Sequence, residues 1–328
     1  MAAATFLSKT DPFATLLLLP NQSPFFGPQR MTPPPPPPLS PSFQPRRTTN
    51  TQQASSSSST TLGMSPTSPS TTTKKRGIFV VLEGIDRCGK TTQCKLLQER
   101  FAAKAMNFPN RSTRVGTMIH EYLTTTPSSN ENTTDKESLN DETIHLLFSA
   151  NRWEASGTIT QTLLEHGQHI VCDRYAYSGV AFSSAKLASS SSSTDNPTPA
   201  LSMDWCMAPD KGLPAPDCVI FLDLEQDQAE QRGGYGNERY EKRDMQLRVR
   251  QQFAKLQAMD QQQERNERTL DTKRHVVEWH VVNAAQSIEE VQEELATIVQ
   301  ETIAKVHGTE DGIARPLGKM WCDGFYES

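Results

Sequence analysis

Residues 84–91 have the types and the spacing of a phosphate-binding loop. Their sequence, GIDRCGKT, fits the pattern G-x-x-x-x-G-K-[ST]. Glycines let consecutive backbone N–H groups point inward around phosphate oxygens. Lys90 would then bridge the outer phosphates, and the Thr91 hydroxyl would bind Mg²⁺. The loop therefore predicts binding of a nucleoside triphosphate.

The residues on either side of this loop predict the elements that such a loop requires. The apolar run Ile78 to Leu82 is typical of a buried strand, and Gln93 to Ala105 are good helix formers. A helix that begins at the loop would add the positive end of its dipole. The alternative is an accidental glycine turn before a helix. The complete motif between a strand and a helix argues against it.

A second set of charged residues follows another predicted strand. The segment His169 to Asp173 is apolar and short, and Asp173, Arg174 and Tyr175 lie at its end. Ligands of open α/β sheets bind beyond the carboxyl ends of the strands. An acid and an arginine at that place would organise Mg²⁺, its waters and phosphate. The alternative is a structural ion pair.

An aromatic residue and an arginine share one face of a predicted long helix, Glu142 to His166. Phe148 and Arg152 are four residues apart, so both side chains lie on the same side. Such a pair can stack on a nucleobase and bond to its edge. Spacing alone favours the alternative, a core phenylalanine beside a surface arginine.

Two other segments could contact phosphate. Arg111 follows Pro109 in a loop near the sheet edge, and by itself it is more often a solvated loop charge than a phosphate ligand. The segment Arg232 to Glu241 has three glycines between charged residues, which indicates a lid that closes over phosphates. The alternative for the second segment is an ordinary surface loop.

Strands and helices alternate from Ile78 onward, which predicts an α/β fold. A further buried strand is expected at Cys218 to Leu224, and another strand at His275 to Val282. Three further helices are expected at Gln226 to Gln231, Asp244 to Arg265 and Ser287 to Val306. This alternation predicts a mostly parallel sheet covered by helices on both faces.

Charge and cysteine content exclude several classes of protein. Residues 1–76 have seven basic residues and one acid, so their net charge is +6, and the remaining residues have a net charge of −11. An acidic body argues against non-specific binding to nucleic acid or to an anionic membrane. The six cysteines have no paired spacing, which indicates a reducing compartment, and they form no metal-ligand cluster with histidine.

Residues 1–75 are expected to form a disordered tail, because they are rich in Ser, Thr and Pro and cannot build a core. Few acids, scattered arginines and many serines resemble an organelle transit peptide. A mitochondrial or plastid location is therefore one expectation. The other is that the tail carries no targeting signal and the protein is in the cytoplasm or nucleus. Met31 and Met64 are possible alternative start sites. The folded domain is expected at residues 76–321, with a short tail at 322–328 and polar loops near Asn130 and Ser190.

Several separate stretches together resemble thymidylate kinase of the eukaryotic type. They are GIDRCGKTTQ, FPNRST, LLFSANRWE, DRYAYSGVAF, DWCMAPDKGLPAPD, GNERYE and PLGKMW, in this order. The resemblance covers Arg76 to Trp321. The phosphate-binding loop alone is generic, but its combination with LLFSANRWE and DRYAYSGVAF is highly specific.

The resemblance implies a role for each matching residue. The ATP phosphates and Mg²⁺ would be held by Gly84, Cys88, Gly89, Lys90, Thr91 and Thr92, with Thr91 as the metal ligand. The catalytic residues would be Arg87, Lys90, Asp173 and Arg174. The dTMP site would consist of Asp86, Arg111, Phe148, Arg152, Arg174, Ser178, Gly179, Phe182, Tyr240 and Gln246. Within it, Phe148 would stack on thymine, Arg152 would bond its edge, and Tyr240 would disfavour ribose.

The implied fold is that of a P-loop nucleoside monophosphate kinase, with a parallel sheet of about five strands flanked by helices. The implied reaction transfers the γ-phosphate of ATP to dTMP in dTTP synthesis, and the family's homodimers imply a dimer through helices. One departure from the family stands out. The stretch before Phe108, AAKAMNFPNR, leaves little room for a second strand, and this places the position of Arg111 in question. Another nucleotide kinase, or a catalytically impaired relative, is therefore the alternative function.

Overall fold

The structure is a computed structural model that describes residues 75–125, 139–187, 199–232, 239–267, 275–308 and 314–326. Four predicted features lie wholly or partly outside these ranges. They are the N-terminal tail, most of the loop near Asn130, the insert near Ser190 and the three glycines of the expected lid.

Five strands in the described residues form one parallel sheet, which confirms the predicted fold. They are β1 (Phe79–Glu83), β2 (Lys104–Asn107), β3 (Ile170–Asp173), β4 (Cys218–Asp223) and β5 (Glu278–Asn283). Their order across the sheet is β2-β3-β1-β4-β5, and every neighbouring pair is parallel. The carboxyl ends of all five strands therefore meet at one edge of the sheet.

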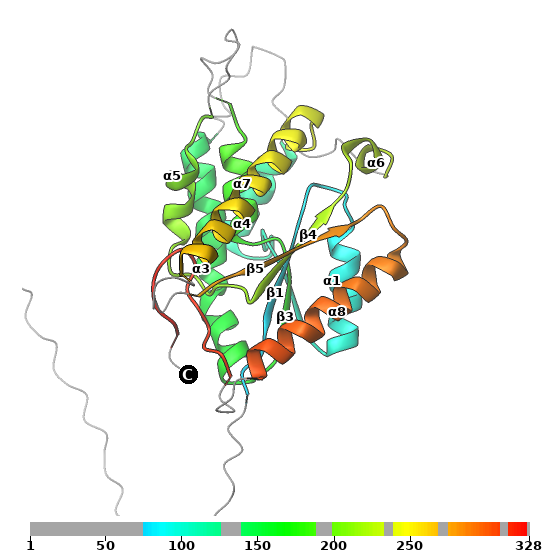
Figure 1. The fold of residues 1–328 in the computed structure, drawn as a ribbon. Coiled ribbons are helices and arrows are strands. Elements are labelled where there is room, and N and C mark those ends of the chain that lie inside the picture. The colour runs from blue at the N-terminus through cyan, green and yellow to red at the C-terminus, as the bar shows by residue number, and fades with distance from the viewer. Residues whose placement is uncertain are drawn as a thin grey trace, which may run out of the picture. The chain divides into compact units, whose positions relative to one another are not determined.

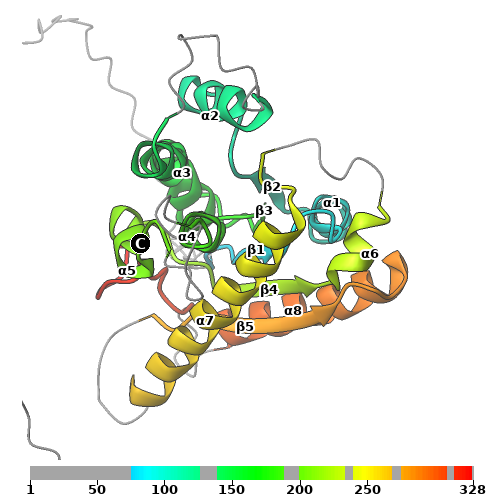
Figure 2. The same cartoon turned by 90° about the horizontal axis from the view of Figure 1, so that it is seen from above.

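Helices cover both faces of this sheet. They are α1 (Lys90–Phe101), α2 (Arg114–Thr124), α3 (Asp141–Leu164), α4 (Ala176–Ser184), α5 (Met203–Met207), α6 (Gln226–Glu230), α7 (Arg243–Glu267) and α8 (Ile288–His307), with a 3₁₀ turn, η2, at Ala208–Asp210. Figures 1 and 2 show α1 and α8 on one side of the sheet and α3, α4 and α7 on the other.

Alternation along β1 explains the two hydrophobic cores. Phe79 and Val81 pack with residues of α3, α4 and α7, whereas Val80 and Leu82 pack with residues of α1 and α8. All four side chains are fully buried. Successive side chains of a strand point to opposite faces, so a strand buried on both sides needs a continuous apolar run. That run is what made β1 predictable.

The prediction for the stretch after the first helix was wrong. The helix was expected to continue to Ala105, but it ends at Phe101 because Ala102 adopts a left-handed conformation with φ of 49° and its N–H bonds to the Gln98 carbonyl. The freed residues form β2, whose Lys104 N–H donates to the His169 carbonyl at 2.8 Å. The second strand is therefore present despite the short sequence.

Two helices near the site were not predicted. Helix α2 begins at a Thr113 cap whose hydroxyl accepts from the Gly116 N–H at 3.0 Å. Helix α4 is buried along almost its whole length, so its sequence AYSGVAFSS has no polar face. A short helix without an amphipathic pattern gives no periodic signal.

His145 of α3 is buried as a neutral imidazole. Its Nε2 lies 2.9 Å from the Cys206 carbonyl, which can only accept, so Nε2 carries the proton and Nδ1 accepts from the Ser183 hydroxyl at 2.7 Å. Burial, and secondarily the charge of Arg152, lower the pKa of His145 to about 4. The unfolded chain, with a histidine pKa of about 6.5, therefore binds more protons than the folded one between these values.

We expect the free energy of unfolding to fall as the pH drops through this window, and to be insensitive to His145 above it. From pH 7 to pH 5 the contribution of His145 to this loss is about 2 kcal/mol. Burial also lowers the pKa of His169, His275 and His280, so the comparison needs a variant. Urea unfolding of His145→Gln and the parent at both pH values isolates the effect. Equal losses in the two proteins would show that His145 is not the titrating group.

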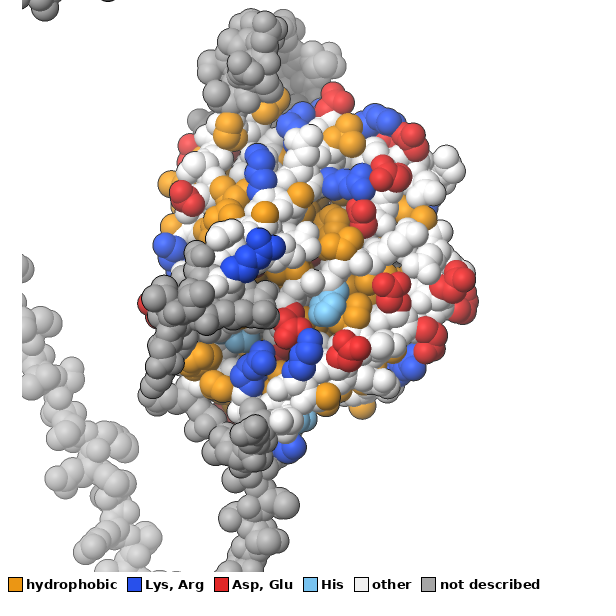
Figure 3. All heavy atoms as spheres, viewed as in Figure 1, with side chains coloured by type: hydrophobic (Ala, Val, Ile, Leu, Met, Phe, Trp, Pro, Cys, Tyr) orange, Lys and Arg blue, Asp and Glu red, His pale blue; other side chains and the backbone are white. Residues whose placement is uncertain are grey.

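The described helices include none that is both long enough and apolar enough to cross a membrane. Figure 3 shows acidic and basic side chains interspersed on the face that carries α7, β5 and α8. Charge of both signs is therefore spread over this face.

Candidate active site

The phosphate-binding loop joins the end of β1 to the start of α1. Gly84 and Gly89 have φ values of 143° and 101°, which side chains rarely adopt. A Cβ atom at Gly84 would lie 2.7 Å from the Leu222 carbonyl oxygen, so glycine is also required there by space. The Lys90 ammonium is buried and donates to the Ile85 carbonyl at 2.7 Å and the Gly84 carbonyl at 3.3 Å. The loop thus has the form that its sequence predicts.

Thr91 and Asp173 bring the loop and the end of β3 together. The Thr91 hydroxyl, in the first turn of α1, donates to the Asp173 carboxylate at 2.6 Å. This contact arises because β1 and β3 are neighbours whose carboxyl ends lie side by side. The two side chains present a pair of oxygen ligands at the mouth of the loop.

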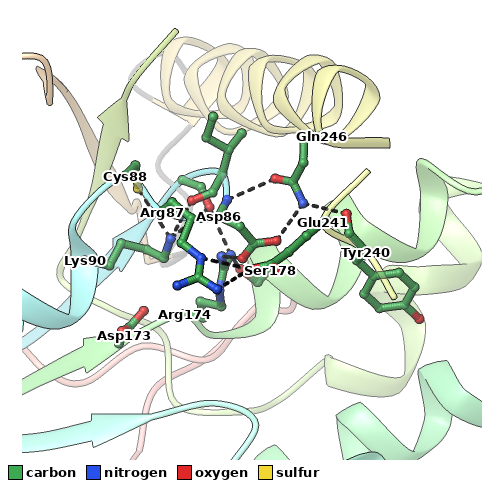
Figure 4. Close-up of polar contacts among 12 residues, drawn as sticks. Asp86, Arg87, Cys88, Lys90, Asp173, Arg174, Ser178, Tyr240, Glu241 and Gln246 are labelled. Atoms are coloured by element: carbon green, nitrogen blue, oxygen red, sulfur yellow. Dashed lines mark hydrogen bonds and ion pairs between the residues drawn. The ribbon is translucent and has the colours of Figure 1, made fainter. Parts of the chain in front are cut away.

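Asp86, Arg174 and Gln246 form a connected polar network (Figure 4). Arg174 donates to one Asp86 oxygen at 2.5 Å, and the Gln246 amide donates to the other at 2.6 Å. The Gln246 carbonyl accepts from the Asp86 backbone N–H at 2.9 Å, and its amide also donates to the Tyr240 carbonyl at 2.8 Å. Although burial opposes the charge, Asp86, Asp173 and Glu83 raise the pKa of Arg174 above its ordinary value. The network therefore holds a permanent positive charge beside the loop.

Arg87 projects from the loop and pairs with a residue that the sequence analysis did not single out. Its Nε and Nη2 lie 3.0 Å and 2.9 Å from Glu241 Oε1 (Figure 4). Glu241 is buried, whereas a third of the Arg87 side chain is exposed. Because Glu241 is the last residue of the expected lid, the C-terminal end of that segment contacts the loop.

A cavity of about 190 Å³ lies next to this network. Its apolar lining consists chiefly of Phe108, Leu123, Phe148, Phe182 and Tyr240. Its polar lining includes Asp86, Arg111, Arg152, Asp173, Arg174, Ser178 and Ser183. Aromatic walls with a few charged groups at one end suit a flat, apolar ring that bears a phosphate.

Phe148 and Arg152 both line this cavity, so the alternative of a surface arginine is wrong. Arg152 is almost fully buried because it forms an ion pair with Asp210 of η2, with its Nη2 2.5 Å from Oδ2 and its Nε 3.2 Å from Oδ1. Ser149 also donates to Asp210 at 2.7 Å. Asp210 is 58 residues away in sequence, so helix spacing gave no sign of this partner.

Gly179 of α4 makes room for the Arg152 guanidinium. A Cβ atom at Gly179 would lie 2.6 Å from Nη2 and 2.8 Å from Nη1, closer than real contacts allow. The predicted contribution of Gly179 to the substrate pocket is therefore a steric one.

We expect Gly179→Ala to displace Arg152 and to raise the KM for dTMP, the acceptor that the resemblance implies, by about tenfold or more, while the KM for ATP changes little. Gly157→Ala is the control. Gly157 lies on α3, the helix that carries Arg152, and an added Cβ atom there meets no atom within 4 Å. Steady-state kinetics of both variants test the effect. An unchanged KM for dTMP in Gly179→Ala would contradict the steric role.

A second cavity, of about 680 Å³, lies over the phosphate-binding loop. From the loop and the start of α1 it is lined by Asp86, Arg87, Cys88, Gly89, Lys90, Thr91, Thr92 and Gln93. Its lining also includes Arg232, Ala284, Gln286, Ile288 and Val291. Arg232 donates to the carbonyls of Arg87 and Ala284, both at 2.9 Å, and so links the loop to the segment after β5.

The two cavities meet at four charged residues that line both. They are Asp86, Arg111, Asp173 and Arg174. Arg111 is thus part of the site, and its guanidinium lies 3.1 Å from His120 Nδ1 of α2. The doubt about its position is removed, because β2 leads the chain to the correct edge of the sheet. Two arginines between a phosphate-binding loop and an aromatic pocket can neutralise charge on both sides.

Tyr240 closes the aromatic cavity from the side of the expected lid. Its ring centroid lies 5.9 Å from that of Phe182 and 6.1 Å from that of Tyr122, and its hydroxyl donates to the Tyr122 hydroxyl at 3.3 Å. The Arg174 guanidinium lies over Phe182, 5.0 Å from the ring centroid. Ser178 accepts from Arg174 at 3.1 Å. Nine of the ten residues that the sequence analysis assigned to the acceptor site line this cavity, and the tenth, Gln246, bonds to Asp86.

Three residues of the site carried no assigned role before the structure. Asp210, Arg232 and Glu241 contact Arg152, the loop backbone and Arg87 respectively. Arg232 and Glu241 are the first and last residues of the predicted lid, and this position was the one indication in the sequence that they lie near the site. Asp210 offered none beyond its place in the stretch DWCMAPDKG.

Comparison with known proteins agrees with this geometry. A family model described as thymidylate kinase matches residues 82–295. The thymidylate kinase of Danio rerio is 41% identical over 252 residues, which cover 75% of this chain and 98% of that protein. The thymidylate kinase of Homo sapiens is 38% identical over 252 residues with the same coverage. A solved structure of thymidylate kinase from Candida albicans is 34% identical and superposes with a TM-score of 0.54, covering 70% of this chain and 93% of that one. On these matches, the chain belongs to the thymidylate kinase family.

Proposed function

We propose that this protein transfers the γ-phosphate of ATP to dTMP and so produces ADP and dTDP, a step in dTTP synthesis. The observation that carries the proposal is the junction of the two cavities at Asp86, Arg111, Asp173 and Arg174. A donor bound over the loop and an acceptor bound in the aromatic cavity would bring their phosphates together there.

ATP occupies the larger cavity in this proposal. The loop N–H groups, the start of α1 and the Lys90 ammonium surround its phosphates. Gly84, Cys88, Gly89, Thr91 and Thr92 supply the remaining contacts with the phosphates. The base would lie toward Arg232 and the segment after β5, because those residues line this cavity and do not line the aromatic one.

dTMP occupies the aromatic cavity. Phe148 stacks on thymine, and Arg152, held by Asp210, bonds to the edge of the base. Phe182, Gly179 and Ser178 complete the pocket. Tyr240 lies against the sugar and disfavours a 2′-hydroxyl. Gln246 supports the same region through Asp86 and the Tyr240 carbonyl.

The transfer itself needs charge neutralisation more than acid–base chemistry. The attacking oxygen belongs to a phosphate that is already ionised, so no strong general base is required. Arg111 would hold the acceptor phosphate, and Arg174 would contact both phosphates from the junction. Arg87 and Lys90 would offset charge on the transferred group. Positioning of the two phosphates supplies the remaining rate acceleration.

The donor set fits Mg²⁺ as the accompanying ion. Thr91 and Asp173 provide two oxygens 2.6 Å apart, and Mg²⁺ prefers a few protein oxygens together with phosphates and waters. When bound, the ion would neutralise phosphate charge.

An acceptor panel tests the substrate assignment. Product analysis after incubation with ATP, Mg²⁺ and equal concentrations of dTMP, UMP or CMP is expected to give dTDP far faster than UDP or CDP. Equal turnover of UMP would refute the roles of Tyr240 and Phe148. Faster turnover of a different nucleotide would favour the rival function of another nucleotide kinase.

The second rival, a catalytically impaired relative, rested on the apparent absence of a second strand. Strand β2 pairs with β3 over four residues, and Arg111 lines both cavities. No observation in the described residues now favours that rival.

We also infer that the protein is a homodimer through its helices. Met118 of α2 and Leu146 and Trp153 of α3 are large apolar side chains between 40% and 48% exposed. Leu146 and Trp153 are seven residues apart and share one helix face. Light scattering of the purified protein is expected to give about twice the 36.5 kDa of one chain. A mass of 36.5 kDa would refute the dimer.

A further inference from the structure

Glu83 is a buried carboxylate that the mechanism above does not use. It is the last residue of β1 and directly precedes Gly84. Its side chain is completely inaccessible to solvent. Alternation along the strand directs it to the same face as Phe79 and Val81, the face that α4 covers. A charged side chain at such a place requires partners.

Three hydrogen-bond donors face this carboxylate, and all come from the start of α4. The backbone N–H groups of Tyr175 and Ser178 donate to Oε1 at 2.9 Å and 3.1 Å, and the Ser178 hydroxyl donates to Oε2 at 2.5 Å. The N-cap residue Tyr175 has no side-chain bond to its own helix. Glu83 therefore caps α4 from a neighbouring strand.

The bond from Ser178 fixes the direction of the next one. A hydroxyl has one hydrogen, and in Ser178 that hydrogen points to Glu83, so its lone pairs face Arg174. Arg174 donates from Nη1 to Ser178 Oγ at 3.1 Å and to the Gly84 carbonyl at 2.9 Å. Figure 4 shows Ser178, Arg174 and Asp86 close together. Carboxylate, hydroxyl and guanidinium thus form one directed chain.

Arg174 depends on such support because of its own backbone. Its φ is 65°, a left-handed conformation that a residue with a side chain adopts only when its surroundings hold it there. Tyr175 and Ser178, which Glu83 binds, lie one and four residues after it. The strain at Arg174 and the cap of α4 are therefore parts of the same turn.

The charges of Glu83 and Arg174 also stabilise each other. Burial raises the pKa of Glu83, while the bonds from Ser178 and the charge of Arg174 oppose that rise. Glu83 in turn is one of the carboxylates that raise the pKa of Arg174.

We propose that Glu83 is a positioning residue for Arg174: by binding Ser178 and the start of α4 it fixes the guanidinium at the junction of the two cavities. This inference rests on the proposed role of Arg174 toward the phosphates. Glu83 itself touches neither substrate, since it lines neither cavity.

A double-mutant cycle tests the proposal. Glu83→Gln keeps the size of the side chain, but its amide group would face Ser178 and reverse the direction of one bond. We expect Glu83→Gln to lower kcat about tenfold with the KM for ATP within about twofold. In an Arg174→Ala background the same change should alter kcat by less than about twofold, because the residue on which Glu83 acts is gone. Single-turnover mixtures make the slow variants measurable.

Asp217→Asn is a matched control for a merely structural effect. Asp217 is also buried and accepts three bonds, from two Arg76 nitrogens and the Phe79 N–H, but at the opposite end of β1. It should lose thermal stability and keep kcat within about twofold. If Glu83→Gln does not fold, Ser178→Ala takes its place in the cycle, because it removes the bridge and leaves both backbone bonds to Glu83.

The outcomes separate the two levels of the inference. An equal fold-change from Glu83→Gln (or Ser178→Ala) in both backgrounds, or an unchanged kcat in the parent background, would overturn the positioning role alone. An unchanged kcat in Arg174→Ala would overturn the role of Arg174 and, with it, the basis for Glu83. A reduced effect in the Arg174→Ala background supports the proposal.

Discussion

Replacing Arg87 with alanine is expected to lower kcat about a hundredfold or more while ATP binding stays roughly intact. Arg87 lies inside the phosphate-binding loop and lines the larger cavity, in which we propose that ATP binds. Its guanidinium can stabilise the negative charge that develops on the transferred phosphate. Its side chain pairs with Glu241 and is one third exposed, whereas the Lys90 ammonium is bound to the loop carbonyls. The loss should therefore appear in the transfer step rather than in nucleotide binding.

The ion pair of Arg87 with Glu241 suggests how this charge is kept in place before transfer. With Nε and Nη2 about 3 Å from one carboxylate oxygen, the guanidinium must exchange at least part of this pairing for phosphate oxygens. Arg243→Ala is a suitable control, because Arg243 is an exposed arginine that pairs with Asp227 and Glu230 and lines neither cavity. Its kcat should stay within about twofold. A wild-type kcat in Arg87→Ala would refute the catalytic role.

The second large effect is expected at Arg152. Replacing it with methionine leaves Asp210 as a buried carboxylate without its cation, so the free energy of unfolding should fall by about 3–5 kcal/mol. The same change removes the group that bonds to the edge of the base, so the KM for dTMP should rise at least tenfold while that for ATP changes little. Urea unfolding and steady-state kinetics measure the two effects separately.

A double variant separates stability from recognition. In Arg152→Met with Asp210→Asn the buried charge is also removed, so much of the lost stability should return, since neutral replacements of a buried pair are often tolerated. The KM for dTMP should remain high. Recovery of both properties would show that Arg152 serves folding alone, and recovery of neither would contradict the assignment of Asp210 as its partner.

The sequence predicted those parts of the fold whose signal is local. Continuous apolar runs marked β1, β3 and β4, because strands buried on both faces leave no polar positions. Strand β2 was missed because it lies at the sheet edge, where KAMN alternates between half-buried and exposed side chains and contains no apolar run. Helix α1 was predicted too long because nothing in QERFAAKAM marks Ala102 as a residue with positive φ.

The parts of the site that depend on local spacing could be recognised from the sequence, and the parts that depend on long-range contacts could not. The glycine loop could be recognised from one segment, since its motif contains its own geometry. The position of Phe148 and Arg152 in the cavity wall could not be recognised in this way, because burial of Arg152 depends on Asp210 of η2 and on the absence of a side chain at Gly179 of α4. Resemblance to a known family assigned both residues to a pocket, and both line the aromatic cavity, whereas the spacing favoured a surface arginine. Glu83 was hidden for another reason: in sequence it is only the acid that ends an apolar run.

The structure also shows which segments of the chain line each cavity. The loop lines the larger cavity, and through Asp86 it also lines the aromatic cavity. The segment from Arg239 to Glu241 lies where the two meet, with Tyr240 on the aromatic cavity and Glu241 on Arg87. A change in this segment is therefore expected to affect both substrates.

The most direct test of the account is ADP release in a coupled assay with ATP, Mg²⁺ and dTMP as the sole acceptor. We predict steady ADP release that depends on dTMP and falls about a hundredfold or more in Arg87→Ala. Absence of dTMP-dependent ADP release from the folded protein would contradict it.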